Sequence, residues 1–291
     1  MSVPAAYLGI ILIWATTPLA IKWSNDSSDF LLAVSARMSL GFVICLLLLL
    51  LLRVPLPWHR EAIMSYVAAG LGIFAAMMSV YWGAQYIPSG LISVLYGLSP
   101  MVIGLFAALW LGERFFTVEK LGGLLLALVG LIVIFVPHSD MGAVAVQGLV
   151  GVLMSVLFHS ASAVWVKRLG TKMHPLAINS GALALAVPLY LISWLLFGSS
   201  LPSQLPVHSL ASILYLAIFG TVIGFNLYFY VLKRIPASVV GVITLITPVL
   251  ALLLGQSLNG EKIGLHVWFG TVAILLGLSV FMWGGRLRGI V

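Results

Sequence analysis

Apolar stretches long enough to cross a bilayer follow one another along the whole of this 291-residue chain. About 20 helical residues, each rising 1.5 Å, span the roughly 30 Å hydrocarbon core of a membrane. The stretches end at charges, prolines or Gly/Ser clusters, and they cover approximately residues 4–22, 30–52, 62–85, 88–111, 118–136, 146–167, 174–197, 209–232, 236–258 and 263–284. We therefore predict an all-α membrane protein with ten transmembrane helices and short connections.

Charged residues make up only 7% of the chain, against about 25% in a typical soluble domain. Because so few charged residues could not cover a globule of this size without leaving large exposed apolar patches, lipid must be the solvent over most of the protein. The net charge of +7 does not indicate nucleic-acid binding, because the basic residues are scattered singly or in pairs. The single cysteine, Cys45, lies in an apolar stretch and excludes an intrachain disulfide. We interpret the first stretch, which lacks a basic leader and an A-x-A-like cleavage site, as a retained helix.

The distribution of lysine and arginine predicts the orientation in the membrane. With a cytoplasmic N-terminus, the outside loops hold only Lys22 and Lys262, and Arg37 lies inside the second stretch. The other eleven fall on the inside, at Arg53, Arg60, Arg114, Lys120, Lys167, Arg168, Lys172, Lys233, Arg234, Arg286 and Arg288. The positive-inside rule therefore predicts a multi-pass protein of the inner (plasma) membrane with both termini in the cytoplasm.

An internal duplication fixes the architecture. A shift of 148 residues aligns, without a gap, Gly72 with Gly220, Ile87-Pro88 with Ile235-Pro236, Ser99-Pro100 with Thr247-Pro248, Gly112-Glu113-Arg114 with Gly260-Glu261-Lys262, and Gly122 with Gly270. Each copy holds five stretches, an odd number, so the second copy enters the membrane from the opposite side. We predict two inverted-topology repeats, residues 1–137 and 138–291, the plan of many secondary transporters.

The motif from Ile87-Pro88 through Ser99-Pro100 to Gly112-Glu113-Arg114 resembles the EamA domain of the drug/metabolite transporter (DMT) superfamily. The resemblance covers nearly the whole chain and includes Trp14 and Arg37. It implies ten helices, cytoplasmic termini and export of metabolites such as amino acids through a central cavity. Two departures concern the substrate: His159 stands where the family often has Trp, and Thr244 is the repeat counterpart of Tyr96.

Polar and aromatic residues deep in the stretches are the candidates for substrate binding, because such carriers bind near the midplane between their halves. His159 is the sharpest candidate, and a 145-residue shift pairs it with Trp14. The alternative is a neutral imidazole bonded to a neighbouring hydroxyl or carbonyl. The predicted cavity is lined by the first, third, fourth, sixth, eighth and ninth helices, and its six predicted binding residues are Trp14, Tyr81, Tyr96, His159, Asn226 and Thr244.

The other four candidates come from two kinds of stripe. Tyr81 and Asn226 belong to aromatic stripes of the third and eighth helices, although such residues also form interfacial belts. Tyr96 and Thr244 lie one turn before Pro100 and Pro248, which remove backbone donors and free carbonyls for a substrate. Proline kinks can equally serve helix packing alone.

We assign structural roles to several further residues. Glu113 and Glu261 follow glycine caps and suit the start of the next helix, where they would lock turns. Arg37, two turns into the second helix, is expected to snorkel or to bond a helix end rather than to touch substrate. Glycines repeat every seventh residue on the fifth and tenth helices and predict close packing: Gly123, Gly130, Gly270, Gly277 and Gly284.

The function predicted from these features is secondary transport of a small neutral or zwitterionic metabolite, with amino-acid or metabolite export as the first choice. All seven acidic residues fall in loops or at span ends, which disfavours proton-coupled export of lipophilic cations. A multidrug or uptake carrier is the alternative, and a receptor or structural role stays open. We predict no enzyme: the only conceivable nucleophile and base are Ser99 and His159, and Ser99, followed by Pro100 and matched by Thr247 in the second repeat, behaves as a structural hydroxyl. The expected partners are a small-molecule substrate and the lipid bilayer, and we expect no cofactor, metal or nucleic acid. The expected oligomeric state is a monomer or a weak homodimer.

Overall fold

A computed structural model describes residues 2–26, 29–112, 117–135, 142–170, 172–199, 206–235 and 243–287, and their regular structure is entirely helical. The helices are α1 (Val3–Asn25), α2 (Phe30–Leu51), α3 (Arg60–Gly83), α4 (Ser89–Tyr96), α5 (Ser99–Leu111), α6 (Val118–Phe135), α7 (Gly142–Leu169), α8 (Pro175–Phe197), α9 (Val207–Tyr215), the π-helix η2 (Leu216–Gly224), α10 (Phe225–Leu232), α12 (Ile243–Asn259) and α13 (Leu265–Leu287). Because α4 and α5 share one span, and α9, η2 and α10 share another, the elements correspond to the ten predicted stretches. The predicted fold class is confirmed.

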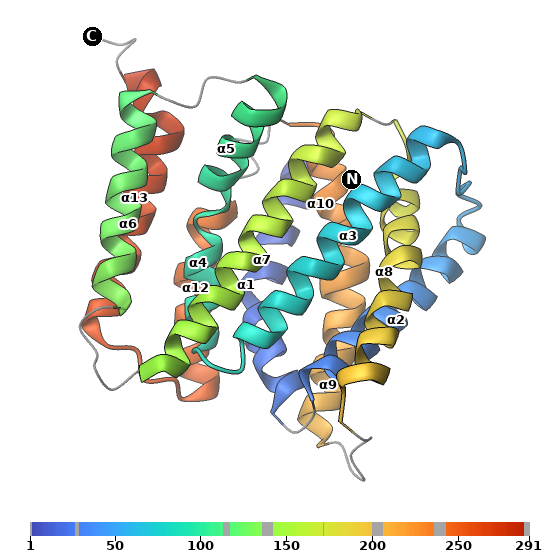
Figure 1. Ribbon diagram of the computed structural model, residues 1–291, viewed down its shortest axis with the longest axis horizontal. Helices are drawn as coiled ribbons and strands as arrows, with labels where there is room; N and C mark the ends of the chain where they lie inside the picture. The colour runs from blue at the N-terminus through green and yellow to red at the C-terminus, as the bar shows by residue number, and fades with distance from the viewer. Residues whose placement is uncertain are drawn as a thin grey trace.

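The two halves of the chain are packed into one another rather than side by side. Helix α1 packs against α10 and α12, and α3 packs against α7 and α8. Helix α2 lies between α8 and η2, while α4 runs along α12 (Figure 1). This interleaving leaves the space at the centre of the bundle bordered by helices of both repeats.

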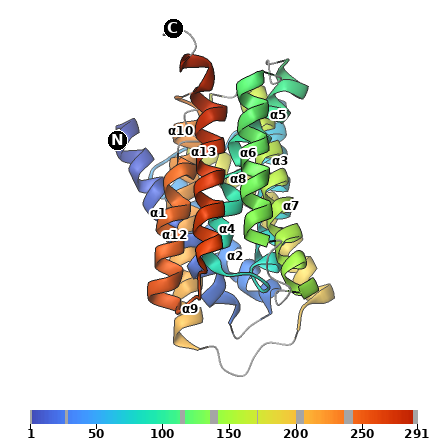
Figure 2. The ribbon, with the colours of Figure 1, turned by 90° about the vertical axis from the view of Figure 1, so that its left-hand side faces the viewer.

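The last span of each repeat stands at one edge of the bundle, where α6 and α13 run alongside each other in both views (Figures 1 and 2). A Cβ atom on Gly123 would lie 2.4 Å from the backbone oxygen of Gly277, and one on Gly130 would lie 2.5 Å from that of Gly270. Only glycine permits so close an approach of two helices. The predicted packing role of these glycines is confirmed.

The two proline motifs have different effects on their helices. In the first repeat, the span formed by α4 and α5 is interrupted between Tyr96 and Ser99. There the backbone N–H of Gly97 donates to the carbonyls of Ser93 (3.1 Å) and Val94 (3.0 Å). Pro100 lacks the N–H that would continue the ladder to Tyr96, so the helix can restart there. Its counterpart α12 continues through Pro248 without a break. Among the described residues, the proline motif of the first repeat therefore coincides with a helix break, whereas Pro248 of the second repeat lies inside a continuous helix.

Glu261 connects the two repeats. We expected this carboxylate to act at the start of the helix that follows it, but it bonds the start of α4 in the first repeat instead. One carboxylate oxygen accepts from the backbone N–H of Ser89 at 2.9 Å, at the start of α4, and from Nδ2 of Asn259 at 3.0 Å. Asn259 in turn accepts a hydrogen bond from the indole N–H of Trp23 at 2.9 Å. The negative charge suits the N-terminus of α4 because the helix dipole is positive there. The repeat counterpart, Glu113, lies outside the described residues.

Candidate functional site

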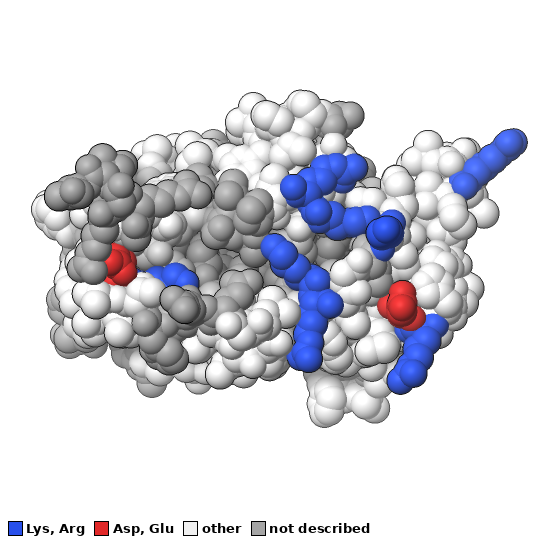
Figure 3. Space-filling model, turned by 90° about the horizontal axis from the view of Figure 1, so that it is seen from above, with Lys and Arg blue, Asp and Glu red and all other residues white. Residues whose placement is uncertain are grey.

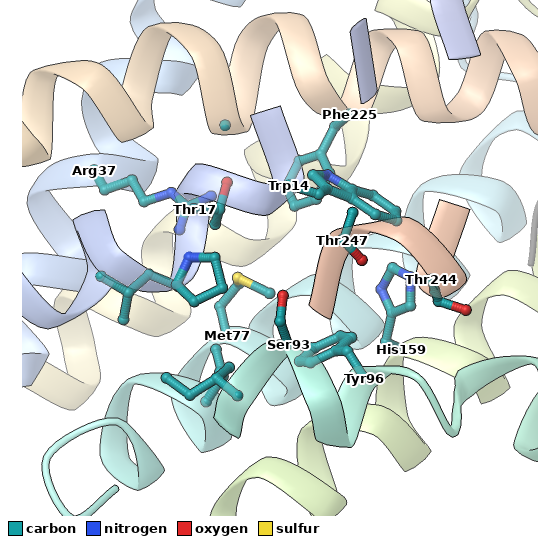
Figure 4. A pocket seen from close by; sticks show the side chains of 15 residues that line it. Trp14, Thr17, Arg37, Met77, Ser93, Tyr96, His159, Phe225, Thr244 and Thr247 are labelled. Atoms are coloured by element: carbon teal, nitrogen blue, oxygen red, sulfur yellow. The ribbon is translucent and has the colours of Figure 1, made fainter. Parts of the chain in front are cut away.

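A cavity lies between the two halves at the centre of the bundle (Figure 4). Its lining residues come from α1, α2, α3 and α4 of the first repeat and from α7, η2, α10 and α12 of the second. The six spans expected to line a cavity all contribute, and α2 joins them through Arg37. The walls are largely apolar, with Pro18, Met77 and Phe225 among their side chains. An apolar enclosure with few polar groups is typical of small-molecule sites.

His159 of α7 stands among three aromatic rings at one end of this cavity. Its ring centroid lies 5.4 Å from that of Tyr228 and 6.1 Å from those of Trp14 and Tyr96. Trp14 and His159 thus meet edge to face across the two repeats, at the positions that the 145-residue shift pairs. Among the described residues His159 has no hydrogen-bond partner, so a polar group of a bound molecule could bond its nitrogens.

Tyr96 and Thr244 also line the cavity, one from each repeat. The hydroxyl of Tyr96 lies 2.6 Å from Oγ of Ser155, which donates to the carbonyl of Ala76. These bonds hold the ring of Tyr96 against α7 at the cavity wall. Thr244 is buried on α12, one turn before Thr247, which lines the cavity as well. The structure thus brings together four of the six predicted residues.

The other two predicted residues, Tyr81 and Asn226, do not line the cavity. Tyr81 is fully buried beyond the wall, and its hydroxyl accepts a hydrogen bond from Arg37. Asn226 is half-buried, and its amide donates to the carbonyl of Val222 in the preceding turn. A stripe on a helix predicts which residues share a face, but neighbouring helices decide which face meets the cavity. The two expectations are corrected on that ground.

Arg37 is the site residue whose role the sequence did not predict. Its side chain is only 2% exposed and lines the cavity, instead of reaching the membrane surface or a helix end. Nε donates to Oγ1 of Thr221 at 3.0 Å, and Nη1 donates to the hydroxyl of Tyr81 at 3.3 Å. These hydroxyls hold the guanidinium inside the bundle. The available signal was position, because Arg37 is the one basic residue placed well inside a predicted span.

A neighbouring feature that sequence reasoning missed is Tyr228, on α10. Its ring lies tilted against those of Trp14 and His159, with centroid distances of 5.4 Å to each. Its hydroxyl is buried without a hydrogen-bond partner in the described structure. The aromatic group around His159 is therefore larger than predicted. Within the described ranges no group of three or more His, Cys, Asp or Glu side chains could hold a metal ion.

Comparisons with known proteins agree on one family. A sequence model of the EamA-like transporter family matches residues 3–136 and again residues 146–283. An uncharacterized transporter of Archaeoglobus fulgidus is 31% identical over 72% of this chain and 75% of its own length. YoaV of Bacillus subtilis, also an uncharacterized transporter, is 27% identical over 93% of this chain and 94% of its own.

Two further matches span nearly the whole chain. The uncharacterized inner membrane transporter YedA of Escherichia coli K12 is 24% identical over 95% of this chain and 91% of its own length. A solved crystal structure superposes with a TM-score of 0.70 at 22% identity, covering 99% of this chain and 98% of the other. This likeness concerns the fold alone. Together the matches point to a transporter rather than an enzyme.

Proposed function

This chain belongs to the EamA-like transporter family and is a multi-pass inner membrane transporter, and from that premise we propose what it moves and how. The proposed cargo is a small neutral or zwitterionic metabolite, an amino acid in the first instance, and the proposed direction is export. The observation that carries the proposal is the cavity between the inverted halves, with Trp14, Tyr96 and His159 around one end. Apolar walls with a few polar groups suit a molecule with an apolar body and a polar head.

Alternating access is supported by how the halves meet around the cavity. In inverted-repeat carriers one half rocks against the other and exposes a fixed central site to each side in turn. Here the tie of Glu261 to Ser89 joins α12 to α4 at one end of the bundle. A movement that opens this end has to break that tie. Because one chain encloses the whole cavity, we propose that a monomer is sufficient for transport.

The proposed orientation places both termini in the cytoplasm. Lys and Arg side chains gather on the face where α1 begins and α13 ends (Figure 3). On the described part of this chain, Lys167, Lys172 and Lys233 surround a hollow between the ends of α7, α8 and α10. This bias supports a cytoplasmic face, since basic residues are retained there during insertion.

Transport is tested with purified protein reconstituted into proteoliposomes. Radiolabelled amino acids are loaded inside, and exchange is measured against unlabelled compounds outside, with empty liposomes as the control. We expect saturable exchange of at least one amino acid with an apolar side chain. Saturable transport of lipophilic cations instead would favour the multidrug alternative. Transport in intact cells that only accumulates the amino acid would favour uptake over export.

A further inference from the structure

A buried positive charge without a negative partner faces the cavity. Arg37 is 2% exposed, and within the described ranges both of its hydrogen-bond acceptors, Thr221 and Tyr81, are neutral hydroxyls. The salt bridge found in the described structure joins His208 to Asp26, both half-exposed. Charges buried in membrane proteins are costly and are commonly paired or face a functional pathway. The position of Arg37 on the cavity wall places it on such a pathway.

The guanidinium still has donors to offer. Arginine carries five N–H donors in a planar fork, and two bonds, from Nε and Nη1, are present here. Nη2 has no partner among the described residues, and a Cβ atom built on Gly220, which also lines the cavity, would come within 2.8 Å of it. Thr221 and Tyr81 hold the fork from two sides. A fork fixed in this way matches the two oxygens of a carboxylate.

The rest of the cavity lacks a counter-charge of its own. Its described lining contains no Asp or Glu side chain, and its polar side-chain groups besides Arg37 and His159 are the indole N–H of Trp14 and hydroxyls such as those of Thr17 and Ser93. Glu261, the acidic group close to α4, is already bonded to the backbone of Ser89 and to Asn259. The cavity is therefore electrostatically suited to an anion, whereas an ammonium group finds no carboxylate in the described lining, only neutral acceptors and ring faces.

We infer that Arg37 is the carboxylate-binding residue of the transport site, and that the cargo class is small monocarboxylates with an apolar body, in which an amino group is optional. Figure 4 shows Arg37 and His159 toward opposite ends of the labelled side chains. The carboxylate binds at the Arg37 end, and the apolar body lies along Met77 toward Trp14 and His159. This inference rests on the proposed function and narrows it, because neutral metabolites without a carboxylate are excluded.

The first test needs no variant. Detergent-purified wild-type protein is titrated with matched compounds of one shape: L-leucine, 4-methylpentanoate, the amide of each, and 3-methylbutylamine. Binding is followed by tryptophan fluorescence and by the shift in melting temperature. We expect both carboxylates to bind at least tenfold more tightly than their amides, and the amine to bind most weakly. Equal binding of acid and amide, or the absence of binding by both carboxylates, would overturn the inference.

Variants then assign the discrimination to one side chain. Arg37→Gln should abolish the difference between acid and amide, whereas Arg37→Lys should keep part of it because the charge stays while the fork is lost. His159→Leu is the matched control: it should weaken acid and amide by the same factor and leave their ratio unchanged. An unchanged ratio in folded Arg37→Gln would assign carboxylate binding elsewhere.

Flux separates this inference from the proposal on which it rests. The same compounds are supplied to proteoliposomes that contain wild-type protein. Transport of L-leucine and L-leucinamide at equal rates would overturn the role of Arg37 and leave the transporter proposal intact. Carboxylate-selective binding without transport of any of the five compounds would support the site and contradict the proposed amino-acid cargo.

Discussion

Gly72 and Gly220 occupy equivalent places in the two repeats, yet they serve different purposes. A Cβ atom on Gly72 would lie 2.1 Å from Cβ of Ser162, so this glycine lets α3 and α7 approach closely. A Cβ atom on Gly220 would instead lie 2.8 Å from Nη2 of Arg37. The first glycine closes a contact between helices, and the second leaves room for a charged side chain. The duplication thus kept the residue while its surroundings diverged.

Two local differences accompany this divergence. The span that contains Gly72 is a regular α-helix, whereas Gly220 lies in the π-helix Leu216–Gly224. Single π-turns are frequent at functional sites. Helices α2 and α8 begin at Phe30 and Pro175, so the place of Arg37 in α2 corresponds to Ala182 in α8. Ala182 is fully buried against Gly70. One half is thus close-packed where the other carries the polar part of the site.

The largest effect is expected at the close-packed glycine. Gly72→Leu would force α3 and α7 apart, and overpacking of this kind costs about 1–3 kcal/mol or more. We expect the yield of monodisperse protein in size-exclusion chromatography to fall more than tenfold. Gly122→Leu is the control, because a Cβ atom at Gly122 meets nothing within 4 Å. A normal yield of Gly72→Leu would contradict the packing role.

The equivalent glycine should respond in function rather than in folding. In Gly220→Ala the new methyl group meets the flexible end of Arg37, which can move aside but then leaves its place on the cavity wall. We expect normal yield and a loss of about tenfold in carboxylate affinity, or about 1.4 kcal/mol. The measurement is titration with 4-methylpentanoate and its amide. A reduced yield with unchanged affinity would show that Gly220 also serves packing, and would remove the contrast with Gly72.

Replacement of His159 tests the end of the cavity to which both repeats contribute side chains. His159→Leu keeps much of the bulk and removes both ring nitrogens, so we expect flux to fall severalfold, since a lost hydrogen bond costs about 1 kcal/mol. Expression and chromatographic profile should stay as in wild type. Flux is compared across about pH 5 to 8 in both proteins, the range in which histidine commonly titrates. Equal flux throughout would rule out His159 as ligand and as proton carrier.

The smallest effect is expected behind the cavity wall. Tyr81→Phe removes the hydroxyl that accepts from Nη1 of Arg37 at 3.3 Å, a long bond, while the shorter bond to Thr221 remains. Carboxylate affinity should fall by about twofold. Thr221→Val, which removes the acceptor at 3.0 Å, should have the larger effect of the two. The reverse order would show that Tyr81 is the main support of the guanidinium.

Features that depend on periodicity along the chain could be predicted from the sequence. The spans, the duplication and the glycine contacts of α6 with α13 follow from spacing, and the meeting of Trp14 with His159 follows from the repeat shift. The roles of Tyr81 and Arg37 could not be predicted in this way, because each depends on which neighbouring helix offers a partner. The π-helix could not be predicted either, since the apolar residues and glycines of its sequence, LAIFGTVIG, are residue types that also occur in the α-helices of this chain. Whether His159 binds cargo stays a prediction.

The glycine-packed pair α6 and α13 has a consequence for assembly in the membrane. Each repeat ends with a helix whose glycine strip fits the last helix of the other repeat, and neither helix contributes a described residue to the cavity. The glycine strip of α6, the fifth span of the first repeat, therefore gains its close-packed partner only after α13 has been inserted into the membrane. A chain truncated before α13 would leave the glycine strip of α6 uncovered at one edge of the bundle.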